Sequence, residues 1–277
     1  MTARRIFRNI NFTIGFCITL TIVLTALLSA GYTPYPPNRM NLSARFQGPD
    51  GSHWFGTDQY GRDIFSRVMK GSINSIIVGL VAVSIGMVFG ILLGSLAAFY
   101  RGWVDEAIMR VSDILYGFPA VLSAILITSL LGPGIMNSMI AIGIFNVPIF
   151  ARLTRATSLS VWERDFVTSA KAIGRTNPGI IREYILPNIL SPLIVQGTVQ
   201  FAIAILAEAG LSYLGLGTQP PHASWGRMLN EAQTFMSTSP WLAVFPGCAI
   251  ALAVLGFNLL GDGLRDILDP RTSRTRL

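Results

Sequence analysis

The chain has 277 residues, of which 51% are hydrophobic and only 13% are charged, and its formal net charge is +7 at pH 7. So few charged residues cannot cover the surface of a soluble globule of this length, so the composition excludes an ordinary soluble domain. A positive chain can bind nucleic acid, but here the basic residues are distributed in a way that indicates membrane topology instead.

Long runs without Asp, Glu, Lys or Arg divide the chain, and a membrane-spanning helix needs about 20 apolar residues. The run at 114–151 is too long for one crossing, and Gly132-Pro133-Gly134 divides it into two. The sequence therefore predicts an all-α, polytopic membrane protein. Its six transmembrane helices are expected at about 12–31, 73–100, 114–131, 135–153, 190–214 and 241–261.

Basic residues are unevenly shared between the segments that join these helices. With the N-terminus inside, the inside segments hold fifteen of the 21 Lys and Arg residues, and the outside segments hold the other six. The positive-inside rule then places the N-terminal segment 1–11, the charged loop 157–188 and the tail 263–277 in the cytoplasm. The first apolar run exceeds the roughly 7–15 residues of a signal-peptide core, so it is expected to be an uncleaved anchor.

The extracytoplasmic segment 32–72 is the largest feature predicted outside the membrane. Its core, HWFGTDQYGRDIFSR at 53–67, begins as a turn and ends as a helix, and Asp63 and Arg67 have the i, i+4 spacing of an ion pair. Two interpretations fit this pattern. One is an interfacial helix that leads into the second span, and the other is a docking surface or lid for an external protein.

Small residues recur every four positions in the second span, within the predicted five-helix core 73–262. Ala82, Gly86, Gly90, Gly94 and Ala98 form this series. Such a ladder lets a second helix backbone approach closely, so the series predicts a helix-packing face. We expect its partner to be another helix of the same chain.

Few residues at membrane depth can carry chemistry. Pro119 and Pro148 fall inside the third and fourth spans, where they should bend the helices. Glu208 is the one carboxylate inside a predicted span, and by helical rise it lies about 27 Å along a core about 30 Å thick, near the outer face. This depth favours an outer-gate, pathway-wall or structural hydrogen-bonding role over a buried proton relay.

The charged loop 157–188 has the pattern of two amphipathic helices. Ser160 and Glu163 have the spacing of a capping box, and Phe166, Ala170 and Ile173 are expected to share one apolar face. Gly174 is expected to end this first helix. Asn177 is expected to cap a second helix and Pro178 to be its first residue, and Leu186-Pro187 should break this helix. A surface-lying loop and a handle for a soluble partner both fit this hairpin.

The same loop resembles the EAA loop of ABC importer permeases, which reads E-A-A, three residues, G, nine residues, I-x-L-P. Ala170, Gly174, Leu186 and Pro187 match that motif in register, and Thr168, Ser169 and Tyr184 stand where it has Glu, Ala and Ile. The string at 53–67 resembles the H-x-x-G-T-D-x-x-G-R-D-x-x-S-R signature of dipeptide and oligopeptide (peptide/nickel) permeases, C-type subunits. The strings at 211–226 and 258–271 add to this resemblance.

The resemblance implies a type I ABC importer permease fold in the bacterial inner membrane. It implies a peptide as the solute, with nickel chelates, glutathione or another small solute as the alternative. It also implies four partners: a second homologous permease subunit, two ATPase subunits that dock on the loop, and an extracytoplasmic binding protein. The chain has no G-x-x-x-x-G-K-[ST] loop, so ATP and Mg²⁺ are expected on the ATPase subunits. We therefore expect no enzymatic activity, no cofactor, no metal and no nucleic acid for this chain. A proton-coupled secondary transporter is the rival class.

Overall fold

The computed structural model describes residues 9–268, and these residues form helices and the loops between them. Residues 1–8 of the predicted N-terminal segment and residues 269–277 of the predicted C-terminal tail lie outside the described residues. Five helical units are long and apolar enough to cross a membrane. They are α2 (Ile10–Gly31), α3 (Ile64–Tyr100), α6 (Ile135–Trp162), the continuous unit of α8 (Asn177–Ile180) and α9 (Leu186–Tyr213), and α11 (Trp241–Leu268).

The third predicted span is wrong as a single helix. The chain forms α4 (Gly102–Gly117) and α5 (Ala120–Leu131), which meet at about 90°, and the pair gives a sixth candidate span only when it is counted as one broken crossing. The break lies at Phe118, whose backbone is extended because Pro119 disfavours helical geometry in the residue before it. Pro119 therefore caps α5, and it does not bend a continuous helix.

The other predicted spans are confirmed in position, but the helices run past them. The α3 helix begins nine residues before the predicted start at 73, so the end of the 53–67 string belongs to the same helix as the second span. The α6 helix continues nine residues beyond 153, through Pro148, and α11 continues to Leu268, beyond the predicted end at 261. Hydropathy marks the part of a helix that lies in lipid, and helices continue into water where their polar faces are solvated.

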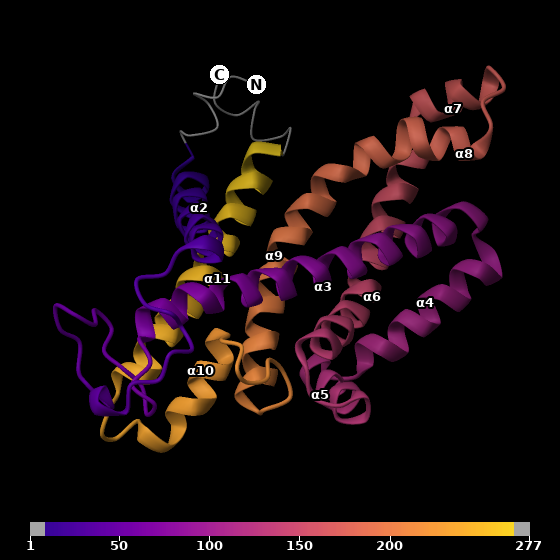
Figure 1. The fold of residues 1–277 in the computed structure, drawn as a ribbon. Helices are drawn as coiled ribbons and strands as arrows, with labels where there is room; N and C mark the ends of the chain where they lie inside the picture. The colour runs from indigo at the N-terminus through magenta and orange to yellow at the C-terminus, as the bar shows by residue number, and fades with distance from the viewer. Residues whose placement is uncertain (1–8, 269–277) are drawn as a thin grey trace.

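The helices pack as one bundle with two ends (Figure 1). The α3 helix packs along α6 and against α9, while α2 packs on α11 and α11 on α9. The first residues of α2, the last residues of α11, and α7 (Asp165–Ala172) with α8 lie at one end (Figure 1). The segment 32–63 and α10 (Trp225–Ala232) lie at the other end. The loop 157–188 therefore lies at the same end of the bundle as the first residues of α2 and the last residues of α11.

The predicted glycine ladder is confirmed, and its partner is α6 of the same chain. A Cβ atom on Gly86 would overlap Asn146, one on Gly90 would overlap Phe150, and one on Gly94 would overlap Ala151. The contact buries Ala82 and Ala98 as well. Glycine at these positions lets α3 and α6 approach closely along their length, and this pair anchors the largest apolar core.

Candidate functional site

The α7–α8 hairpin, residues 163–185, projects from one end of the bundle, where α6 turns into α7 (Asp165–Ala172) (Figure 1). Gly174 ends the first limb, as predicted. Its φ is +81°, and the turn closes with hydrogen bonds from the Gly174 N–H to the Lys171 carbonyl (3.0 Å) and from the Arg175 N–H to the Ala170 carbonyl (3.1 Å). Only glycine adopts this φ without strain, so the turn depends on that residue.

The predicted start of the first limb is wrong. The α6 helix runs through Ser160 to Trp162, and α7 begins at Asp165 after two intervening residues. Ser158 and Val161 are buried in the last turns of α6, and their packing keeps the chain helical past the proposed capping box. Asp165 in the first turn of α7 instead places a negative charge at the positive end of that helix.

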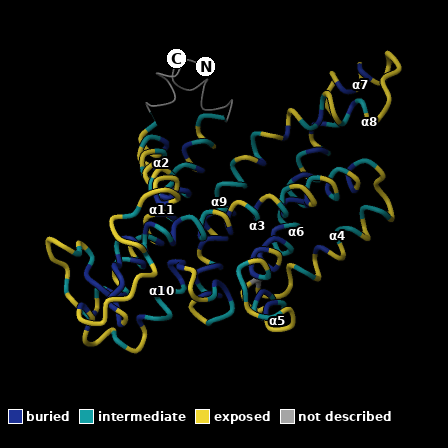
Figure 2. The backbone as a smooth tube through the Cα atoms, in the orientation of Figure 1, coloured by how far each residue is buried: buried dark blue, intermediate teal, exposed yellow. Residues whose placement is uncertain are grey.

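The buried face of α7 also differs from the predicted one. Val167 and Ala170 are the buried residues, whereas Phe166 is 37% exposed and Ile173 is 75% exposed. Val167 and Ala170 belong to the same apolar core as Ile180 and Ile185 of the second limb. The hairpin therefore uses one apolar stripe to hold its own limbs together and leaves two large apolar side chains at its surface, where Figure 2 shows an exposed tip.

The second limb starts one residue earlier than predicted, and it does not end at Leu186-Pro187. Thr176 caps α8, Pro178 lies in its first turn, and a π-helical turn at 181–185 joins α8 directly to α9. Within this turn the Leu186 N–H donates to the Ile181 carbonyl, five residues back. A proline at 187 cannot donate to residue 183, and the wider turn accommodates that loss, so the hairpin continues rigidly into a membrane span.

The motif residues lie on both limbs of the hairpin. Thr168 and Ser169 are exposed on α7, and Tyr184 and Leu186 are half-buried near the base of α9 beside exposed Pro187. The Tyr184 ring lies 6.3 Å from the ring of Phe166, so the limbs also contact at their surface. Exposed Arg164 and Arg182 add positive charge to the hairpin. The result is a short, charged and partly apolar projection suited to contact with another protein.

Glu208 lies at the opposite end of the bundle, as its predicted depth requires, and it is fully buried. Its Oε1 accepts hydrogen bonds from Ser212 Oγ (2.6 Å) and Thr218 Oγ1 (3.2 Å), and its Oε2 accepts from Ser75 Oγ (3.5 Å). Ser212 Oγ in turn accepts from the Thr218 N–H (2.8 Å). In this conformation the carboxyl group reaches no open surface, and it ties α9 to α3 and to the loop before α10.

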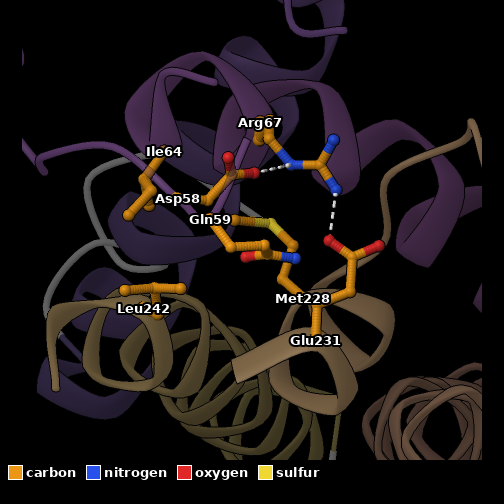
Figure 3. A pocket seen from close by; sticks show the side chains of 7 residues that line it. All are labelled: Asp58, Gln59, Ile64, Arg67, Met228, Glu231 and Leu242. Atoms are coloured by element: carbon orange, nitrogen blue, oxygen red, sulfur yellow. Dashed lines mark hydrogen bonds and ion pairs between the residues drawn. The ribbon is translucent and has the colours of Figure 1, made fainter. Parts of the chain in front are cut away.

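A buried charge cluster at the same end was not predicted (Figure 3). Glu231 of α10 accepts on Oε2 from Arg62 Nη2 (2.7 Å) and Arg67 Nη2 (3.1 Å), and Arg62 Nε donates to Asp58 Oδ2 (2.6 Å). The side chain of Arg67 is only 1% exposed. A cavity of about 10 Å³ lies beside the cluster and is large enough for about one water molecule.

The predicted ion pair between Asp63 and Arg67 is wrong. Asp63 caps α3 by accepting from the Ser66 N–H (2.8 Å), and its other oxygen lies 2.8 Å from His53 Nδ1. These contacts turn its carboxylate away from Arg67, which faces Glu231. The true partner lies 164 residues away in the sequence, so no local spacing could have revealed it. Nearby, the pKa of the exposed Asp50 carboxylate is held below its usual value. The main cause is a hydrogen bond from the backbone N–H of His53, and the Ser52 side chain donates another.

Clusters of metal-ligating side chains were sought among the described residues. Between residues 9 and 268, no group of three or more His, Cys, Asp or Glu side chains is placed to hold one metal ion.

Known proteins resemble this chain over most of its length. The family model described as binding-protein-dependent transport system inner membrane component matches residues 86–274. A dipeptide transport system permease protein, DppC, from Alkalihalophilus pseudofirmus is 47% identical over 258 residues, which is 93% of this chain and 85% of the relative. A glutathione transport system permease protein, GsiD, from Escherichia coli is 46% identical over 253 residues, 91% of this chain and 84% of that protein.

Solved structures share the fold at low sequence identity. A subunit of the MetNI methionine ABC transporter in an inward-facing conformation superposes with a TM-score of 0.64 at 15% identity, covering 74% of this chain and 98% of the other. At this identity the likeness establishes the fold alone.

Proposed function

We propose that this chain, which belongs to the family of binding-protein-dependent transport system inner membrane components and is a permease subunit of an ABC importer, imports peptides. It does so by coupling two ATPase subunits to its membrane helices through the α7–α8 hairpin. The observation that carries this proposal is the hairpin itself, which leaves Phe166 and Ile173 exposed. Its first limb follows the long helix α6 after two residues, and its second limb continues into α9.

Coupling requires a contact between the hairpin and its partner that differs between two states of the complex. A partner that binds the hairpin equally well in two conformations shifts no equilibrium, so ATP binding can move the bundle only through differential contact. The hairpin suits this role because its limbs are joined by buried side chains and a fixed turn at Gly174. It therefore moves as a unit, and α6 and α9 receive that movement directly.

The remaining partners complete the proposed assembly. A second, homologous permease subunit would form the other half of the translocation pathway, and an extracytoplasmic binding protein would deliver solute to the end that carries segment 32–63 and α10. ATP and Mg²⁺ would be held by the ATPase subunits. We place this assembly in the bacterial inner membrane with both termini cytoplasmic, which agrees with the distribution of basic residues.

Peptides are the preferred solute because the dipeptide permease relative is 47% identical to this chain. Glutathione is the second candidate, because the glutathione permease relatives reach 46% identity over a similar length. Glutathione is itself a modified tripeptide, so both relatives indicate a small peptide-like solute. Calorimetry with the cognate binding protein, using a labelled dipeptide and glutathione separately, distinguishes the two.

The coupling role is tested by replacing Gly174 with tryptophan in the full complex. No atom lies within 4 Å of the position where its Cβ would be, so the substitution strains the backbone at φ +81° without blocking the fold of the bundle. We expect normal membrane insertion with loss of the ATPase subunits on purification, or loss of solute-stimulated ATP hydrolysis. Gly210, which also has open space at Cβ but lies in α9, is the matched control. Retained ATPase subunits and normal uptake in Gly174→Trp would contradict the proposal.

A further inference from the structure

The α4 helix is held weakly by apolar packing within this chain. Of its residues from Gly102 to Gly117, only Ser112 is buried. Val111, Ile114 and Tyr116 are each more than half exposed, and Figure 2 shows the helix in the exposed and intermediate colours. By contrast, α3 is joined to α6 by the buried glycine ladder. The position of α4 must therefore depend on other contacts.

Two arginines of α6 supply those contacts. Arg155 donates from Nε and Nη2 to the two carboxylate oxygens of Asp105, each at 2.5 Å. Arg152 donates from Nη2 to Asp113 Oδ1 (2.7 Å), and its guanidinium lies 4.6 Å from the centre of the Tyr116 ring. A bidentate arginine–carboxylate pair fixes the orientation of the two side chains as well as their distance. The second pair, two turns along α4, prevents rotation of α4 about the first pair.

The same stretch of α6 lies next to the hairpin. Arg155 is seven residues before Trp162, the last residue of α6, which corresponds to about 10 Å along the helix. The α7 helix begins three residues after Trp162, and Lys171 Nζ near the end of α7 lies 4.6 Å from the centre of the Trp162 ring. A displacement of α7 is thus delivered to the end of α6, about two turns from Arg155 and about three turns from Arg152.

We infer that Arg152 and Arg155 are positioning residues that make α4 follow α6, so that movement of the α7–α8 hairpin reaches α4 and the α5 segment beyond it. This inference rests on the proposed function, because it takes the hairpin as the input. Since charge pairs rather than apolar packing join α4 to α6, removing the carboxylates should release α4 and leave the α3–α6 core intact.

A distance measurement in the assembled complex tests the inference. Spin labels are placed at Ala107 of α4 and Ala156 of α6, which are both exposed, in a background where Cys17 and Cys248 are serine. We expect the interspin distance to be the same without nucleotide and with a non-hydrolysable ATP analogue. In the double variant Asp105→Asn, Asp113→Asn, we expect the distance to broaden and to shift on nucleotide binding.

The matched control is Glu106→Gln, which removes an exposed ion pair to Arg110 within α4 and does not involve α6. Its interspin distance should behave as in the unmodified chain. Exchanging the charges in Asp105→Arg, Arg155→Asp should restore the fixed distance in part, a rescue that a merely structural role for either residue does not predict.

Coupling is the second readout. Loss of the pairs should lower the number of labelled dipeptide molecules imported per ATP by about tenfold, since a charge-assisted hydrogen bond contributes enough to change an equilibrium constant by that factor. An α4–α6 distance that changes with nucleotide while both pairs are intact, or one that stays fixed in the double variant, would overturn the inference. ATPase subunits that fail to co-purify with the unmodified chain would overturn the proposed function and this inference with it.

Discussion

Replacing Glu231 with alanine should loosen the end of the bundle that carries segment 32–63 and α10. The substitution removes the carboxylate that accepts from Arg62 (2.7 Å) and Arg67 (3.1 Å). Among the described residues, this leaves the Arg67 side chain, which is 1% exposed, with Asp58 at 3.8 Å as its remaining ion-pair partner. Breaking a buried ion pair by removing one partner costs about 3–5 kcal/mol, because the remaining charge stays buried without compensation. Every 1.4 kcal/mol is a factor of ten, so local opening should become roughly two to four orders of magnitude more frequent.

Amide hydrogen exchange in the purified protein measures this opening directly. We expect faster exchange in α10 and in the first turns of α3, which the cluster joins, with little change in the α3–α6 core. Glu106→Ala is the control, because its pair with Arg110 is 3.9 Å long and more than 70% exposed on both side chains, so its loss should cost at most about 1 kcal/mol. Exchange in Glu231→Ala no faster than in this control would refute the reasoning.

Two further substitutions test the packing and the buried carboxyl group. Gly90→Leu should separate α3 from α6 and destabilise the bundle by about 1–3 kcal/mol, because its Cβ would overlap Phe150; a thermal melt compared with Gly247→Leu, whose Cβ has open space, checks this. Glu208→Ala should destabilise the protein by about 1–3 kcal/mol for each hydroxyl left without an acceptor, and more than Glu208→Gln, which keeps one acceptor oxygen. Equal melting of the two Glu208 variants would contradict the hydrogen-bonding account, whereas normal uptake in Glu208→Gln would remove the predicted outer-gate role.

Hydropathy and residue spacing predicted the parts of the fold that depend on the bilayer and on small side chains. Uncharged runs located the spans because lipid tolerates few charges, and the interval of four between Gly86 and Gly94 identified a packing face because that interval follows helical geometry. The turn at Gly174 was also predicted, since its positive φ is a local property of glycine.

The errors share a different physical origin. Ser160 and Glu163 have the spacing of a helix start, but buried Ser158 and Val161 keep α6 helical through that position. Local rules predict that Pro187 breaks the helix, but a π-helical turn just before it keeps the helix continuous. In each case a tertiary contact, or a backbone geometry that accommodates the residue, outweighed the local preference.

The long-range partners of charged residues could not be predicted from the sequence. The contact from Arg67 to Glu231 spans 164 residues, and that from Arg155 to Asp105 spans 50. Helical spacing reveals only neighbours on the same helix, so it assigned Asp63 to Arg67 and missed both long-range pairs. These pairs join α10 to α3 and α4 to α6.

Site-specific photo-crosslinking from the hairpin tests the central claim most directly. A photoreactive residue at Ile173, which is 75% exposed, should form an adduct with an ATPase subunit in the assembled complex, and the same residue at Trp54, 62% exposed at the opposite end, should not. An ATPase adduct from Trp54, or none from Ile173 in a complex that hydrolyses ATP and imports solute, would contradict the account.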